Sequence, residues 1–76
     1  MENYCYLTFS TTYFALRSEA LLRETTLPFK LVPVPRSISS SCGTALRCSC
    51  TDLATIRETL ERSRVIIEGS YGPFDR

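Results

Sequence analysis

Six short segments that alternate between strand and helix patterns restrict the fold of this chain more than any other feature. Apolar and aromatic residues predict a first strand, and a hydroxyl-rich turn followed by apolar residues at helical spacing predicts a first helix. A second strand, a loop, a third strand, a second helix and a fourth strand follow. The strands are expected at 4–9, 29–34, 45–50 and 65–71, the helices at 11–25 and after Thr51-Asp52, and a tail at 72–76.

The order strand, helix, strand, strand, helix, strand is that of two split β-α-β units. It predicts an α+β, ferredoxin-like sandwich with a four-stranded antiparallel sheet and both helices on one face. The first and third strands are expected in the centre, and the second at an edge because Pro33 cannot donate to a ladder. Alternation then leaves Tyr4, Tyr6, Thr8 and Arg47 on the open face, which is a candidate dimer surface.

Each predicted helix has one apolar side that is expected to face the sheet, because its apolar residues recur at helical spacing. In the first helix this side consists of Phe14, Ala15, Ser18, Leu21 and Leu22. In the second helix it consists of Leu53, Ile56 and Leu60.

The composition is typical of a soluble globular protein, with 43% hydrophobic and 22% charged residues in a chain of 76. One domain spanning residues 1–76 is expected, because so short a chain has no room for a second core. Nine basic and eight acidic residues give a net charge of +1, which does not favour nucleic acid as a partner. The absence of histidine excludes serine and cysteine hydrolase triads and zinc sites of mixed cysteine and histidine type.

The N-terminal region shows no signal peptide, because residues 3–16 mix serine and threonine into what would be the apolar segment. No apolar run approaches the ~18 residues that a membrane span requires. These observations predict a cytoplasmic protein without a membrane segment. The four cysteines, at positions 5, 42, 48 and 50, are accordingly expected to be thiols, since cytosolic reductants keep cysteines reduced.

Cys42 lies in the loop between the second and third strands and is followed directly by Gly43. Long ordered loops often carry function, and glycine permits a positive φ that turns backbone N–H groups toward the sulfur. Cations and N–H donors lower the pKa of a thiol and raise its thiolate fraction, which favours nucleophilic sulfur chemistry. The groups expected to act on Cys42 in this way are Arg36, Ser39, Ser40, Ser41, Gly43, Thr44 and Arg47.

Simpler interpretations of the cysteines are also open. Cys42 can be a small residue that fills a gap under the loop, with the serines as turn formers. Cys5, Cys48 and Cys50 are interpreted as small apolar residues under the helices, because a C-x-C spacing within a strand is a weak metal signal. No metal site and no cofactor are therefore predicted, and metal or redox sensing through the four cysteines is a third hypothesis.

The segment from Val32 to Arg47, VPVPRSISSSCGTALR, resembles the signature of the DUF3343 family, which is described as selenium/sulfur carrier proteins. The resemblance extends to Leu7-Thr8-Phe9, the segment from Ala15 to Leu22, Asp52-Leu53 and Glu68-Gly69. It implies a bacterial, intracellular domain in which the family's Cys-Gly pair corresponds to Cys42 and Gly43.

The resemblance and the residues around Cys42 together lead to a carrier hypothesis. Cys42 would accept a sulfur or selenium atom from a donor protein, hold it as a persulfide or perselenide, and deliver it to an acceptor protein. The alternative is a non-catalytic module that binds a small anion or a protein, in which Cys42 is structural. The expected partners are thus proteins and, through the sheet, a second copy of the chain.

Overall fold

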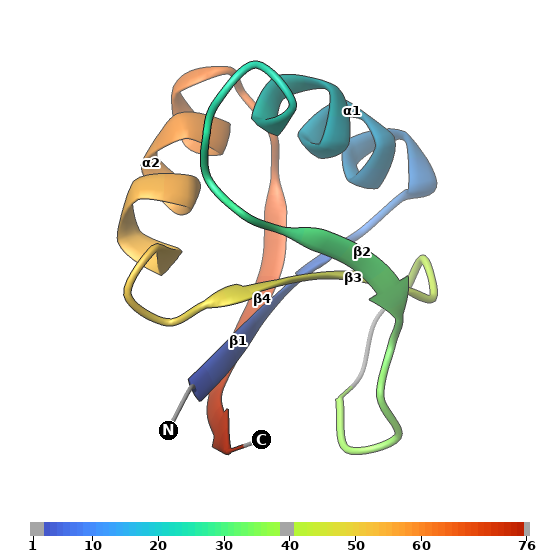
Figure 1. The fold of residues 1–76 in the computed structure, drawn as a ribbon. Coiled ribbons are helices and arrows are strands. Elements are labelled where there is room, and N and C mark those ends of the chain that lie inside the picture. The colour runs from blue at the N-terminus through green and yellow to red at the C-terminus, as the bar shows by residue number, and fades with distance from the viewer. Residues whose placement is uncertain (1–2, 39–40, 76) are drawn as a thin grey trace.

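The computed structural model describes residues 3–38 and 41–75 of the chain. Within these residues the elements follow the predicted order strand, helix, strand, strand, helix, strand (Figure 1). The α+β, ferredoxin-like fold is thereby confirmed. The elements are β1 (Asn3–Phe9), α1 (Thr12–Leu22), β2 (Lys30–Pro33), β3 (Thr44–Ser49), α2 (Leu53–Arg62) and β4 (Ile67–Asp75).

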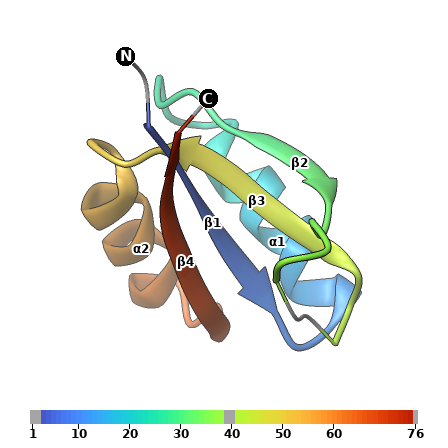
Figure 2. The same ribbon diagram turned by 90° about the horizontal axis from the view of Figure 1, so that it is seen from below.

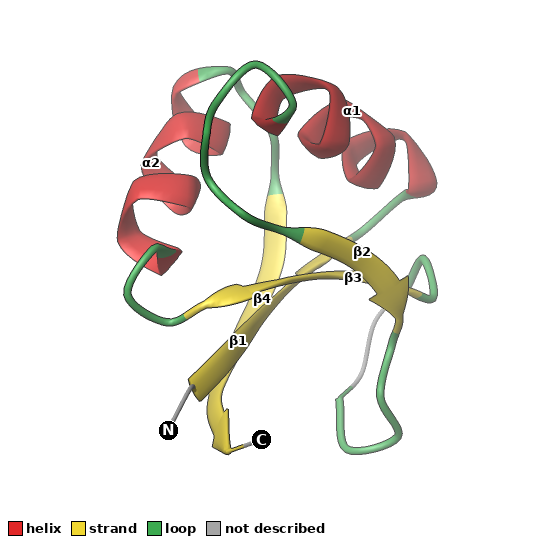
Figure 3. Cartoon of the chain, viewed as in Figure 1, coloured by secondary structure: helices red, strands yellow, loops and turns green. Residues whose placement is uncertain are grey.

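The strands form one antiparallel sheet in the order β2-β3-β1-β4 (Figure 2). The central positions of β1 and β3 and the edge position of β2 agree with the prediction. An edge strand accommodates Pro33, because a strand with one free side does not need every N–H in the ladder. Both helices lie on one side of the sheet, and the loop between β2 and β3 lies on the other side (Figures 1 and 3).

The core lies between the sheet and the helices, where every second residue of β1 and β3 points toward the helices. Its buried members are Cys5, Leu7, Phe9, Ala15, Leu22, Leu46, Cys48, Ile56, Leu60 and Val65. Phe14, Leu21 and Leu53 are partly buried against this cluster. The helix faces predicted from the spacing of apolar residues are therefore the faces that pack on the sheet.

Helix α1 begins soon after β1 because a hydroxyl caps its first turn. The side chain of Thr11 accepts a hydrogen bond from the N–H of Phe14 at 3.4 Å, as an N-cap threonine does. In the middle of α1 the fully buried Ser18 donates to the carbonyl oxygen of Phe14 at 2.8 Å. Because the hydroxyl of Ser18 forms this hydrogen bond within the helix, its burial against the sheet costs little free energy.

Strand β4 is longer than predicted, and the expectation of a tail at residues 72–75 was wrong. The register between β1 and β4 shifts near Gly72 and Pro73, which form a bulge in the ladder. A bulge tolerates proline because the ladder there does not need its missing N–H group. Beyond it, the ring of Phe74 meets that of Tyr6 edge to face, with centroids 5.5 Å apart. Pairing with β1 thus resumes at Phe74 and Asp75, although the Gly-Pro pair favours a turn.

The described residues of the loop between β2 and β3, 34–38 and 41–43, cover part of the face that the helices leave open (Figure 1). Thr8, predicted to be exposed on this face, is fully buried, and so is its partner Ala45 in β3. Neither residue belongs to the core under the helices, and Ile38 of the loop is also buried outside that core. Because the loop lies on this side of the sheet (Figure 1), we attribute the burial of Thr8 to it.

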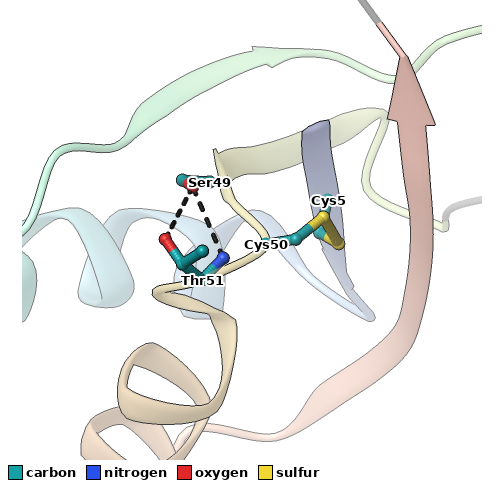
Figure 4. Close-up of a disulfide and its surroundings, with 4 residues drawn as sticks. All are labelled: Cys5, Ser49, Cys50 and Thr51. Atoms are coloured by element: carbon teal, nitrogen blue, oxygen red, sulfur yellow. Dashed lines mark hydrogen bonds between the residues drawn. A yellow bond between two sulfur atoms is a disulfide. The ribbon is translucent and has the colours of Figure 1, made fainter. Parts of the chain in front are cut away.

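Cys5 and Cys50 form a disulfide that joins β1 to the turn between β3 and α2 (Figure 4). Their Cα atoms lie 5.2 Å apart, within the usual range for a disulfide. The N–H of Cys50 also donates to the carbonyl oxygen of Asn3 at 3.2 Å, and the hydroxyls of Ser49 and Thr51 lie 2.9 Å apart across the turn. The expectation of four thiols was wrong for these two cysteines, because the turn after Ser49 brings Cys50 back to β1.

Candidate functional site

Cys42 lies two residues before β3, where the loop returns to the sheet. Its side chain is half-buried and packs against the core under the helices. The thiol donates a hydrogen bond to the carbonyl oxygen of Thr44, with 3.3 Å between sulfur and oxygen. The sulfur is therefore held in one position at the edge of the core while part of the side chain remains accessible to solvent.

Gly43 has a φ of +76°, which confirms the predicted left-handed backbone conformation after Cys42. Its carbonyl oxygen accepts a hydrogen bond from the N–H of Val34 at 3.1 Å, which extends the pairing of β2 with β3. A Cβ placed on Gly43 would meet no atom within 4 Å, so the requirement for glycine comes from φ and not from crowding. The contact described at the sulfur is with the carbonyl of Thr44, whereas the sequence predicted backbone N–H groups there.

Ser41 connects the loop to β4 through two hydrogen bonds with Glu68. Its hydroxyl donates to Oε2 of the carboxylate at 2.6 Å and its N–H donates to Oε1 at 3.1 Å. These two donors, the hydroxyl first, lower the pKa of Glu68 below its ordinary value. The residue before Cys42 is thereby held against the edge strand of the sheet.

Glu68 is the residue of this region that sequence reasoning did not identify as a partner of the loop. The Glu68-Gly69 pair was noted only as part of the family resemblance, and no local pattern relates it to a serine 27 positions earlier. Two of the predicted site residues, Ser39 and Ser40, lie outside the residues that the structure describes.

Arg36 and Arg47, the two cations predicted near Cys42, occupy different parts of the molecule. Arg36 is exposed and lines an open groove beside the loop, together with Ser41, Glu68 and Tyr71. Arg47 lies on the open face of the sheet, where its guanidinium carbon is 4.8 Å from the centre of the Tyr4 ring. The structure thus brings Arg36 to the loop region and does not bring Arg47 to the sulfur.

The other cysteines are held in states that limit their reactivity. Cys5 and Cys50 are bonded to each other. Cys48 is only 3% exposed, and burial, with a smaller contribution from the charge of Asp52, raises its pKa to about 11. Because the thiolate is the reactive form, the Cys48 thiol is inert at neutral pH.

Among residues 3–38 and 41–75, no group of three or more cysteines and carboxylates is arranged to hold a metal ion. In the same residues no helix is long and apolar enough to cross a membrane.

The comparison with protein families gave a match over most of the chain. A family model described as "Putative Se/S carrier protein-like" matches residues 4–72, which include Cys42, Gly43 and both members of the Ser41–Glu68 contact. The searches of curated proteins and of solved structures gave no match. Because the family model covers most of the sequence, the chain belongs to the Se/S carrier protein-like family.

Proposed function

We propose that residues 1–76 act as one carrier domain that holds a sulfur or selenium atom on Cys42 and passes it between proteins. The observation that carries this proposal is the state of the four cysteines. Two are joined in a disulfide, and Cys48 is buried with a raised pKa. Cys42 is half-buried in a loop and outside any disulfide, which leaves it as the thiol a partner can reach. Membership in the carrier-like family supports the same chemistry.

In the loading step, the Cys42 thiol first loses its proton to solvent, and the thiolate attacks the outer sulfur of a donor persulfide. A new S–S bond forms on Cys42, the S–S bond of the donor breaks, and the electron pair leaves on the donor thiolate. In delivery, an acceptor nucleophile attacks the outer sulfur and Cys42 leaves as a thiolate. Both steps are exchanges that need no external oxidant or reductant, and a perselenide undergoes the same two exchanges.

The loop has two supports that suit it to this role. Ser41, tied to Glu68, fixes the backbone before the sulfur, and Gly43 sets the backbone direction after it. We assign Arg36, exposed in the adjacent groove, as the cation that approaches the terminal anionic sulfur of the loaded protein. Ser39 and Ser40 complete the proposed anion-stabilising loop, whereas the carbonyl oxygen of Thr44 holds the thiol before it loses its proton.

The proposal implies two protein partners, a persulfide donor such as a cysteine desulfurase and an acceptor enzyme, in a bacterial cytoplasm. Both partners must reach the same sulfur, so they bind one after the other at the loop. An open groove lined by Ser41, the residue before Cys42, fits this sequence of contacts, because a partner bound at the loop can exclude water during exchange.

Incubation with a cysteine desulfurase and cysteine, followed by intact-protein mass measurement, tests the proposal. We expect the wild type and Cys48→Ser to gain the mass of one sulfur atom, and Cys42→Ser to gain none. The Cys48 variant is the matched control because it removes a thiol at the opposite end of β3 that burial makes inert. Equal mass gain in Cys42→Ser and in the wild type would contradict the assignment. Selenocysteine and a selenocysteine lyase in place of the sulfur system decide between the two elements.

A further inference from the structure

Two cationic residues, Lys30 and Arg47, lie directly opposite each other on the open face of the sheet. They are Cα partners in the β2–β3 ladder, and their neighbours Leu31 and Leu46 face the helices. Like charges in opposed positions destabilise a sheet. Within the residues that the structure describes, neither cation forms an ion pair. Repulsion between two neighbouring cations, left without a counter-charge, is expected at a site that binds a ligand of opposite charge.

Aromatic and polar groups surround the cation pair. The guanidinium carbon of Arg47 lies 4.8 Å from the centre of the Tyr4 ring, a cation–π contact that holds the group above this face. A groove next to this contact is lined by both cations together with Tyr4 and Ser49. The groove therefore offers two cationic donors, a hydroxyl and an aromatic surface to a single ligand.

A second copy of this chain is poorly suited to the groove. Pairing of two open faces would bring Lys30 and Arg47 of both copies into one interface, and the like charges would repel each other. The helices of a second copy offer carboxylates that are already in pairs four residues apart, namely Glu19 with Arg23, Arg57 with Glu61, and Glu58 with Arg62. A net charge of +1 is also too small for the broad basic surface that nucleic acid requires. Charge complementarity therefore favours carboxylates supplied by another protein.

We propose that this groove binds an acidic peptide segment of a partner protein. Arg47 and Lys30 donate to its carboxylates, and the ring of Tyr4 contacts the carbon chain that bears them. The site is separate from Cys42, because Arg47 points away from the helices whereas Cys42 packs against the core beneath them. Binding at the groove does not depend on sulfur transfer, so the site stands or fails independently of the carrier function.

The test uses a short acetylated poly-glutamate peptide as the probe and a poly-serine peptide of equal length as its control. Binding is followed by the backbone amide shifts of β2 and β3 in the wild type, Lys30→Gln, Arg47→Gln and Arg62→Gln. Arg62 is the matched control, since it is exposed on α2 and carries the same charge. We expect each of the two groove variants to weaken binding roughly tenfold, and Arg62→Gln to bind like the wild type.

A second measurement separates a binding role from a structural one. Lys30→Gln removes a like-charge pair, so its Tm without peptide should rise by about 1–4 °C while its affinity falls. Poly-glutamate binding should also weaken as salt is raised. Three results would each overturn the proposal. The first is that Arg62→Gln weakens poly-glutamate binding as much as the groove variants do. The second is tighter binding of a single-stranded oligonucleotide than of poly-glutamate, and the third is self-association that Lys30→Gln abolishes.

Discussion

Strand β3 has cysteines near both of its ends, and the two ends hold sulfur in different ways. Before the first residue of β3, Cys42 sits in a loop, half-buried, with its thiol donating to a backbone carbonyl. At the other end, Cys48 is sealed in the core and Cys50 is bonded to β1. The surroundings of each cysteine therefore determine what its sulfur does, since the residue type is the same at both ends.

The difference follows from where the helices and the turn lie. The far end of β3 lies under the helices, which removes Cys48 from solvent. It continues into the short turn before α2, where Cys50 is bonded to Cys5. The near end receives a long loop from β2, which leaves Cys42 at the margin of the core. We propose that the disulfide end of β3 contributes stability and that the Cys42 end offers a reactive thiol.

Removal of the disulfide should have the largest effect. The Cys5–Cys50 bond closes a sequence separation of 45 residues, for which the loss of loop-closure entropy predicts a stabilisation of about 4 kcal/mol. The double variant Cys5→Ala/Cys50→Ala should therefore lose about that much free energy of unfolding in a urea titration. Labelling of Cys42 by an alkylating reagent should change little under native conditions.

Reductant provides the control for this change. A thiol reductant should lower the Tm of the wild type and leave that of the double variant unchanged. A wild-type Tm that is insensitive to a reductant shown by mass to have opened the bond would contradict the structural role. A large change in Cys42 labelling in the folded double variant would show that the two ends of β3 are coupled.

The fold was predictable because each element has a local signal. The strand, helix and edge assignments came from alternation, from helical spacing and from Pro33, and the structure confirms them. The end of β4 was missed because Gly72 and Pro73 favour a turn locally, while pairing with β1 imposes a bulge. Local preference yields to tertiary contact at such positions.

The site was predictable in part for the same reason. The Cys42-Gly43 pair is a local signal, and the positive φ of Gly43 follows from it. The disulfide and the Ser41–Glu68 contact join residues distant in sequence, and cysteine spacing does not determine connectivity. Alternation did predict that Arg47 faces away from the helices, whereas the side chain of Cys42 packs against the core beneath them, so spacing along the chain did not show that the two side chains differ in this way.

Substitution of Gly43 should have an intermediate effect, confined to the loop end of β3. A φ of +76° costs a β-branched residue about 2 kcal/mol, although the space around the Cα is open. Gly43→Val should therefore lose about 2 kcal/mol of unfolding free energy and change the alkylation rate of Cys42. Gly43→Asn is the control, because asparagine tolerates this conformation and should retain most of the stability. Equal stability of the two variants would mean that backbone strain at this position is unimportant.

Substitution of Ser41 should have the smallest effect, and it tests how the loop is attached to β4. The hydrogen bonds from Ser41 lower the pKa of Glu68, so the folded state favours the carboxylate. The stability that these hydrogen bonds contribute is therefore fully present above the ordinary glutamate pKa of 4.5. It is lost as the pH falls through the lowered pKa of Glu68 in the folded protein. Ser41→Ala removes the hydroxyl donor and keeps the N–H donor, so the Glu68 pKa should rise toward 4.5 without reaching it.

A carboxyl-detected NMR titration measures this shift, with the exposed Ser10→Ala as control. If the Glu68 midpoint is the same in Ser41→Ala as in the wild type, the loop is not fastened through this hydroxyl, and the position of Cys42 depends on Gly43 and the core alone.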